Sequence, residues 1–413
     1  MSHAGGDERL KYGELLVIGY NGSLPGGNRG RQRSRMPLFR RPTANGVKPS
    51  LGGQAWQQED SSQSGHSVSF GVPGHHPLVI NYVQDDTTDM FQVGRSPEAP
   101  IDMVVSGRRQ GDELGGVCTV SRFACRLICQ RNPPHRARLY AAGFDTSNSI
   151  FLGEKAPKWQ GSSGEMDALT TNGVLLMQAP NSGECAVWRE VSVGGQVFPL
   201  SEMRSSRHPE ALVRNETNEL QDGSLIDLCG ATLLWRSARE SFSGSYLPYL
   251  KSHNTPPLSL ATSSAGSASH LEACLTCGHV VQVQTVKRQE WTCCARTLQL
   301  GGSSDIGYSV AKSGQSDVCH GQYRSTDRCP TCQVQGNYSP LSLGCEAGLC
   351  VDDGPPTHAF VPCGHVCSGP TARFWATTGL PHGTQAFHAV CPFCGRQLTG
   401  EKGYVELCFD SEQ

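Results

Sequence analysis

Residues 363–367 read CGHVC and residues 391–394 read CPFC, and these two stretches decide the fold of the C-terminal half of the chain. The same order occurs once before, with CGHV at 277–280 and CPTC at 329–332. Each copy offers three thiols and one imidazole, a donor set typical of a tetrahedral structural zinc ion. The repeat predicts two closed zinc sites, at Cys277, His279, Cys329 and Cys332 and at Cys363, His365, Cys391 and Cys394.

Neighbouring side chains leave alternatives for single ligands. Cys367 follows His365 by two residues and His388 precedes Cys391 by three, so either could replace a ligand of the second site. Cys274 stands three residues before Cys277, so this pair could form a knuckle of its own. A catalytic cysteine would need a nearby base and a lowered pKa, and no thiol in the sequence is distinguished in this way.

The distribution of cysteine supports metal rather than disulfides. Of the 19 cysteines, 14 lie between Cys274 and Cys408, and the odd total does not suit a disulfide framework. No secretory signal is recognisable, and thiols in the cytosol stay reduced. We therefore expect two zinc ions in a cytoplasmic protein.

Charge and hydropathy exclude two classes of partner. The 35 basic and 37 acidic residues give a net charge of -2, whereas a protein that binds nucleic acid through its whole surface is far more basic. No apolar run approaches the roughly 18 residues that span a bilayer. We expect a soluble protein with neither nucleic acid nor a membrane as its partner.

The first 236 residues are predicted to form a β-sandwich. Short apolar runs such as ELLVIG at 14–19 and PLVINYV at 77–83 alternate with turn signals such as Asn172-Gly173, and no long stretch has a helical period. The basic stretch 23–60 is expected to be a flexible loop, and the Ser-rich stretch 237–270 a flexible linker.

Three fragments at predicted strand ends could form one binding surface. They are Gly94-Arg95-Ser96, Ser121-Arg122 and Thr171-Asn172-Gly173. Arginine offers a planar fork of donors to a phosphate, serine adds a hydroxyl, and asparagine can fix a ligand backbone. Each fragment alone is a common turn or strand end, but together they predict recognition of a phosphorylated peptide.

Longer strings resemble the Pellino family, which joins a forkhead-associated domain to a RING-like domain. The resemblance is carried by KYGELLVIGYN at 11–21, TDMFQVGRSPEAPI at 88–101, LTTNGVL at 169–175 and NELQDGSLIDLCGATLLWR at 218–236, and it resumes at 343–351 and 354–400. It covers roughly two-thirds of the chain.

The resemblance implies a mainly β protein: a forkhead-associated β-sandwich at 1–236, a linker at 237–270, and a small RING-like α+β domain at 271–413. It implies zinc ligands in the family's CHC2CHC2 pattern, which map onto the eight residues of the repeat. It also assigns phosphothreonine binding to Arg95, Ser121, Arg122, Thr171 and Asn172.

The implied function is that of a RING-type ubiquitin ligase in Toll and interleukin-1 receptor signalling. Its partners would be a ubiquitin-conjugating enzyme charged with ubiquitin and phosphorylated interleukin-1-receptor-associated kinases. Such a ligase contributes proximity and orientation and has no catalytic residue of its own.

The chain departs from the family between about 237 and 328. His279 and Cys329 are separated by 49 residues, whereas His365 and Cys391 are separated by 25, and we interpret 281–317 as an insertion. If the insertion disrupts the first zinc site, the alternative function is a phosphopeptide-binding scaffold without ligase activity.

Overall fold

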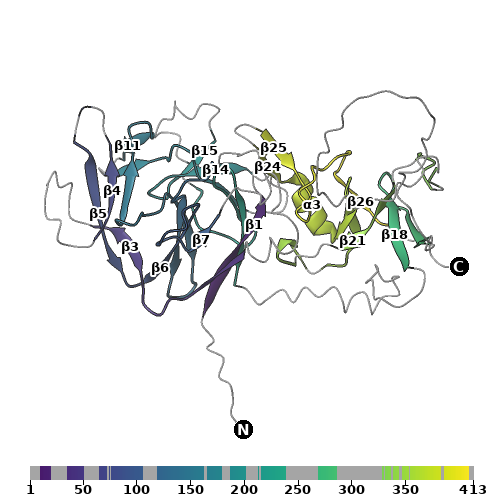
Figure 1. Cartoon of the computed structure of the whole chain (residues 1–413), viewed down its shortest axis with the longest axis horizontal. Helices are drawn as coiled ribbons and strands as arrows, with labels where there is room; N and C mark the ends of the chain where they lie inside the picture. Colours follow the sequence, from purple (N-terminus) through teal and green to yellow (C-terminus); the bar gives the residue numbers. More distant parts are fainter. Residues whose placement is uncertain are drawn as a thin grey trace, which may run out of the picture.

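The computed structural model describes residues 10–19, 35–50, 65–105, 119–178, 187–200, 213–238, 268–285 and 328–408, apart from short gaps at 72–73, 75, 162–164, 214, 330, 336–337, 344–346, 353 and 383–385. A larger N-terminal half built of strands lies beside a smaller C-terminal half that contains helix α3 (Gly369–Thr377) (Figure 1). None of the helices in these ranges is long and apolar enough to cross a membrane. The mainly β architecture predicted from the sequence is confirmed.

The N-terminal half contains seventeen of the named strands. They are β1 (Lys11–Gly19), β2 (Arg35–Phe39), β3 (Gly46–Pro49), β4 (His66–Phe70), β5 (Leu78–Asp85), β6 (Thr88–Gly94), β7 (Met103–Val104), β8 (Cys125–Gln130), β9 (Ala137–Ala141), β10 (Ser149–Leu152), β11 (Lys158–Gln160), β12 (Met166–Ala168), β13 (Leu175–Met177), β14 (Trp188–Val191), β15 (Val197–Pro199), β16 (Leu225–Asp227) and β17 (Thr232–Ser237).

These strands form a sandwich with a smaller sheet beside it. A seven-stranded sheet has the order β15-β14-β13-β16-β17-β1-β2, and a four-stranded sheet has the order β7-β6-β8-β9. The core between them joins Leu15 and Leu233 of the first sheet to Val93 and Leu127 of the second. Strands β10-β4-β5-β3 form a further sheet, and β11 and β12 pair with each other.

The seven-stranded sheet is apolar on both faces. Successive side chains of a strand point to opposite faces, and in β1 both Leu15 and Leu16 are buried. Leu15 belongs to the inner core of the sandwich, whereas Leu16 and Ile18 join a second apolar cluster on the outer face. A run without polar alternation, such as ELLVIG, is expected for a strand that is covered on both sides.

The described part of the basic stretch 23–60, residues 35–50, differs from the flexible loop that we expected. Strands β2 and β3 form within it, because Leu38 is fully buried in the sandwich core and Arg41 is tied to the sheet. The Arg41 guanidinium donates to the carbonyl oxygen of Met90 and lies 4.5 Å from the centre of the Phe91 ring. The basic composition concealed these apolar contacts.

The C-terminal half consists of small sheets around one helix. Its strands are β18 (Ala268–Cys274), β19 (Val280–Thr285), β20 (Tyr338–Pro340), β21 (Ser342–Leu343), β22 (His358–Phe360), β23 (His365–Cys367), β24 (Gly379–His382), β25 (Ala386–Ala389) and β26 (Tyr404–Glu406), and a 3-10 turn covers Ala347–Leu349. They form sheets β19-β18-β20 and β21-β23-β22-β26 and the hairpin β24-β25. Helix α3 is capped by Ser368, whose hydroxyl accepts a hydrogen bond from the Thr371 amide.

The two halves share the outer apolar cluster of the seven-stranded sheet. Leu16 and Leu234 of that sheet pack in one cluster with Phe360 and Trp375 of the C-terminal half. The indole Nε1 of Trp188 donates to the Gly379 carbonyl oxygen at 2.7 Å, across the boundary. Residues 239–267 of the expected linker and 286–317 of the expected insertion lie outside the described residues.

Candidate metal centres and phosphopeptide site

The second predicted zinc site is assembled from two tight turns. Cys363 and His365 flank the turn between β22 and β23, and Cys391 and Cys394 follow β25. Their ligand atoms all lie within 4.8 Å of one another. These four residues are the predicted set.

Both turns of the second cluster depend on glycine. Gly364 has φ +71° and Gly395 has φ +74°, in the left-handed region that favours glycine. Their amides donate back across the turn, Gly364 to the Phe360 carbonyl oxygen and Gly395 to that of Cys391, both at 2.8 Å. The chain therefore doubles back at each turn and brings its two ligands to the same side.

The two alternates lie outside this cluster. Cys367 is fully buried in the apolar cluster shared by the two halves, and burial raises the pKa of its thiol. The ring Nδ1 of His388 lies 3.4 Å from the side-chain nitrogen of Gln397. We propose that neither residue is a ligand.

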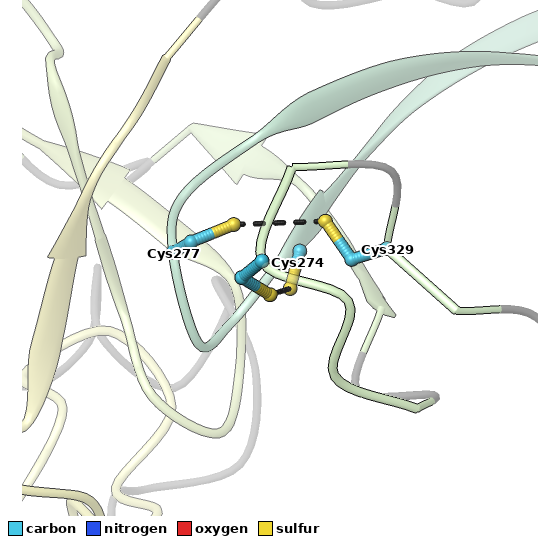
Figure 2. Close-up of side chains that lie close together, drawn as sticks. Cys274, Cys277 and Cys329 are labelled. Carbon is cyan, nitrogen blue, oxygen red and sulfur yellow. Dashed lines mark hydrogen bonds between the residues drawn. The ribbon is translucent and has the colours of Figure 1, made fainter.

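The first cluster differs from the predicted set in one residue. The structure groups Cys274, Cys277, Cys329 and Cys332, with all four sulfurs within 4.8 Å of one another. Figure 2 shows Cys277 facing Cys329 from the opposite turn and Cys274 beside them. His279, which we predicted as a ligand, lies outside this group, with Nδ1 4.0 Å from the Cys329 sulfur.

The spacing of the sulfurs fits zinc. Because Zn–S bonds are about 2.3 Å, the sulfurs at the corners of a tetrahedron lie roughly 3.8 Å apart. The Cys277 and Cys329 sulfurs are 3.6 Å apart, and those of Cys274 and Cys332 are 3.8 Å apart. In the second cluster the buried Nδ1 of His365 has no hydrogen-bond partner, and a metal ion would satisfy it. We propose that Cys274, not His279, completes the first site.

Each cluster contains a thiol that ionises readily. Burial opposes the thiolate of Cys329, but hydrogen bonds from the Cys332 amide and the Tyr338 hydroxyl outweigh it and lower the pKa of Cys329 to about 5. Hydrogen bonds from the Cys363 and Cys391 thiols lower the pKa of Cys394. Since the thiolate is the form that binds metal, Cys329 and Cys394 are available to bind at neutral pH, whereas the pKa values of Cys277 and Cys391 are raised and these thiols would lose a proton as the metal binds.

The three fragments of the predicted phosphopeptide site meet at one end of the sandwich. Gly94 ends β6, and the backbone amide of Arg95 donates to the Ser121 carbonyl oxygen at 3.1 Å. The side-chain amide of Asn172 donates to the Ser121 hydroxyl oxygen at 3.1 Å. These bonds join all three fragments into one surface.

The side chains needed for phosphate lie at the solvent boundary. Arg95, Arg122 and Thr171 are exposed, while Ser121 and Asn172 are half-buried. Within the described ranges neither arginine forms an ion pair with a carboxylate. A β-carbon at Gly94 would lie 2.0 Å from the Arg122 carbonyl oxygen, so only glycine allows the end of β6 to lie this close to the turn that carries Ser121 and Arg122. We propose that the five residues bind a phosphorylated threonine.

Sequence reasoning missed two supporting residues. Thr119 accepts a hydrogen bond from Asn172 at its carbonyl oxygen, at 2.9 Å, and its hydroxyl donates to the Cys229 carbonyl oxygen. Tyr338 donates to the thiolate of Cys329 from the adjacent strand β20. No local pattern distinguishes either residue: the partners of Thr119 are 53 and 110 residues away, and nothing in the nine positions from Cys329 to Tyr338 predicts their contact.

Comparison with known proteins finds one domain match in each half of the chain. A model of the Pellino FHA domain matches residues 3–250, and a model of the Pellino RING domain matches residues 311–413. The human E3 ubiquitin-protein ligase pellino homolog 2 is 46% identical over 97% of this chain and 96% of its own length. The chain belongs to the Pellino family.

Other Pellino relatives extend the match to distant animals. Pellino homolog 3 of Mus musculus is 46% identical over 98% of this chain and 91% of its own length, and protein pellino of Drosophila melanogaster is 40% identical over 99% and 96%. The RING match and these relatives place the chain among RING-type ubiquitin transferases. Neither domain model covers 251–310, where Cys274, Cys277 and His279 lie.

The ligand set of the first centre can be tested by paired substitutions. Cys274→Ser should lower the zinc-to-protein ratio from near two to near one, because a serine hydroxyl does not replace a thiolate ligand. His279→Gln should keep the ratio near two. Metal analysis after treatment with a weak chelator measures both ratios. If His279→Gln loses an ion and Cys274→Ser keeps both, His279 is the ligand.

Phosphothreonine binding can be tested at Arg95. Arg95→Ala should weaken binding of a phosphothreonine peptide by ~1.5–3 kcal/mol, because a charge-assisted hydrogen bond to the phosphate is lost. Arg136→Ala is a matched control, since its guanidinium is also partly exposed but lies against Glu219. Calorimetry with phosphorylated and unphosphorylated peptides gives the difference, and equal affinity for both peptides contradicts the assignment.

Proposed function

We propose that this protein is a RING-type ubiquitin ligase directed to its substrates by phosphothreonine. Its RING domain would bind a conjugating enzyme charged with ubiquitin, and its forkhead-associated domain would bind the phosphorylated substrate. The observation that carries the proposal is the presence, in one chain, of two clusters of potential zinc ligands and a separate surface with two exposed arginines, Arg95 and Arg122.

The metal centres are structural in this proposal. Each cluster already supplies four donors, so a bound zinc ion has no open position for water or substrate. A bound zinc ion would therefore contribute to folding and not to catalysis. Its contribution to the free energy of folding is about 10–16 kcal/mol per site in small zinc domains. The protein would hold the thioester of the charged conjugating enzyme near a substrate lysine, and that lysine would attack it directly.

The phosphorylated substrate would dock at the end of the sandwich. Arg95 and Arg122 provide two guanidinium groups for the phosphate, and Asn172 is held in place by Ser121 and Thr119. The family resemblance points to interleukin-1-receptor-associated kinases of the Toll and interleukin-1 receptor pathway as substrates. The same resemblance favours a cytoplasmic location.

The shared core of the two halves supports a direct transfer. Trp188 and Leu234 on the sheet pack in one apolar cluster with Trp375 and Phe393 beside the second metal cluster. This packing keeps the second cluster at a fixed distance from the phosphopeptide surface. A substrate bound at that surface would meet the charged conjugating enzyme at high effective concentration.

The scaffold alternative depended on a disrupted first zinc site. The four thiols of Cys274, Cys277, Cys329 and Cys332 come together even though the chain between 285 and 328 is long. A long loop costs little in closure entropy, since each doubling of its length adds only about 0.6 kcal/mol. The geometry of the cluster favours the ligase over the scaffold.

An autoubiquitination assay with a panel of conjugating enzymes tests the proposal. The intact chain should form ubiquitin conjugates with at least one enzyme, and Cys391→Ser/Cys394→Ser should abolish them because the second centre no longer binds zinc. Arg95→Ala is the control that retains the RING domain, so it should keep autoubiquitination. Absence of conjugates with every enzyme, from zinc-loaded protein, would favour the scaffold.

A further inference from the structure

The two metal-binding units repeat the same arrangement of paired strands. In the first unit Ala273 pairs with Val280 across a hairpin, and in the second Ala359 pairs with Val366. Both positions are shifted by the same 86 residues (359 − 273 and 366 − 280). The hairpin and the Cys-Gly-His sequence at its turn therefore recur with one spacing, although the metal clusters use Cys274 and Cys277 in the first unit and Cys363 and His365 in the second.

The third strand of each unit recurs as well. Cys274 pairs with Tyr338 in the first unit, and Phe360 pairs with Tyr404 in the second. These strands, β20 and β26, differ by 66 residues (404 − 338) and run antiparallel to the first strand of their hairpins. Each unit is thus a three-stranded sheet that carries one metal cluster.

After its third strand, each unit extends into the other. Ser342, which follows β20 of the first unit, pairs in parallel with His365 of the second. Cys408, which follows β26 of the second unit, pairs in parallel with His279 of the first. Ser342 and Cys408 differ by 66 residues (408 − 342), as the third strands do, and His279 and His365 differ by 86 (365 − 279), as the hairpins do. The two pairings are therefore equivalent, and the exchange is reciprocal.

The exchanged segments contact the turns that carry the ligands. The Ser342 amide donates to the Gly364 carbonyl oxygen at 3.1 Å, and the Cys408 amide donates to the Gly278 carbonyl oxygen at 2.9 Å. Gly278 and Gly364 each stand directly between a cluster cysteine and a histidine. Each ligand-bearing turn is therefore hydrogen-bonded to a strand of the other unit.

The units also share a small apolar core. It joins Leu271, Ala273 and Val280 of the first unit to Ala359, Val366 and Leu407 of the second. Most of these side chains belong to strands that a metal-bound turn fixes at one end. Both sheets are small, and in small metal-binding domains the free energy of metal binding contributes directly to folding.

We propose that the two metal centres bind zinc cooperatively through the reciprocally exchanged strands. An ion in one centre orders the hairpin and the third strand of its own unit. The segment that follows this third strand pairs with the sheet of the other unit, so part of that sheet is already ordered before the second ion binds. The second ion then orders fewer residues and binds more tightly. Such ordering produces positive coupling between two sites without direct contact between the ions.

The coupling can be measured with a thermodynamic cycle on the full chain. Native mass spectrometry in zinc buffered by a chelator counts species with zero, one and two ions and gives the stepwise binding constants. Cys329→Ser/Cys332→Ser leaves only the second centre, and Cys391→Ser/Cys394→Ser leaves only the first. The product of the two constants of the wild-type chain should exceed the product of the two single-centre constants by about 5–150-fold. Equal products overturn the proposal.

A second pair of variants keeps every ligand and tests the exchanged contact itself. A β-carbon at Gly278 would lie 1.6 Å from the Glu406 carbonyl oxygen of the other unit, whereas at Gly400 the nearest atom, of Val361, is 4.0 Å away. Both glycines have φ +80°, so alanine introduces the same backbone strain at each. Gly278→Ala should lower the wild-type product of constants at least fivefold and Gly400→Ala should not. Equal effects of the two variants overturn the proposal even if the cysteine variants fail to fold.

Discussion

The seven-stranded sheet has two apolar faces, and the rest of the structure is arranged to cover both. Its inner face is covered by strands β6, β8 and β9 of the same half. Its outer face, which includes Leu16 and Leu234, is covered by the second metal-binding unit. Burial of apolar area contributes about 25 cal/mol per Å², so an uncovered sheet face of this size is costly. The second metal cluster therefore takes its position from the sheet.

This dependence extends to the first metal cluster. The second unit lies on the sheet, and the first unit is joined to the second by the exchanged segments that end at Ser342 and Cys408. Among the described residues of the first unit, none belongs to the apolar cluster on the outer face of the sheet. In the described part of the chain, its strands are held by its own thiols and by the strand from its neighbour.

The sequence was sufficient for the class of fold and for most of the site. The run ELLVIG indicated a buried strand, and the repeated CGHV and CPxC identified seven of the eight residues in the two clusters. Cys274 was weighed only as an alternative, because the repeat pairs His279 with His365. Cys274 occupies the position equivalent to Phe360 in the second unit. Spacing alone cannot reveal that its thiol, rather than the His279 ring, lies in the group with the other three sulfurs.

Other features required the three-dimensional arrangement. Strands β2 and β3 lie in a basic stretch whose few apolar residues gave no periodic signal, although Leu38 is fully buried. The Thr119 carbonyl oxygen contacts Asn172, which is distant in the sequence, and the Tyr338 hydroxyl contacts Cys329 in a loop whose course the sequence does not indicate. The exchange between the units is a property of pairing partners, which composition and spacing do not specify.

The central claim is that phosphate recognition at one end of the sandwich directs ubiquitin transfer by the RING domain. The most direct measurement is the single-turnover rate of transfer from a charged conjugating enzyme to a lysine of one substrate, in its threonine-phosphorylated and unphosphorylated forms, below saturation. The account predicts a rate about 10–100-fold higher for the phosphorylated form, because charge-assisted hydrogen bonds to the phosphate contribute about 1.5–3 kcal/mol to binding. Equal rates for the two forms would contradict it.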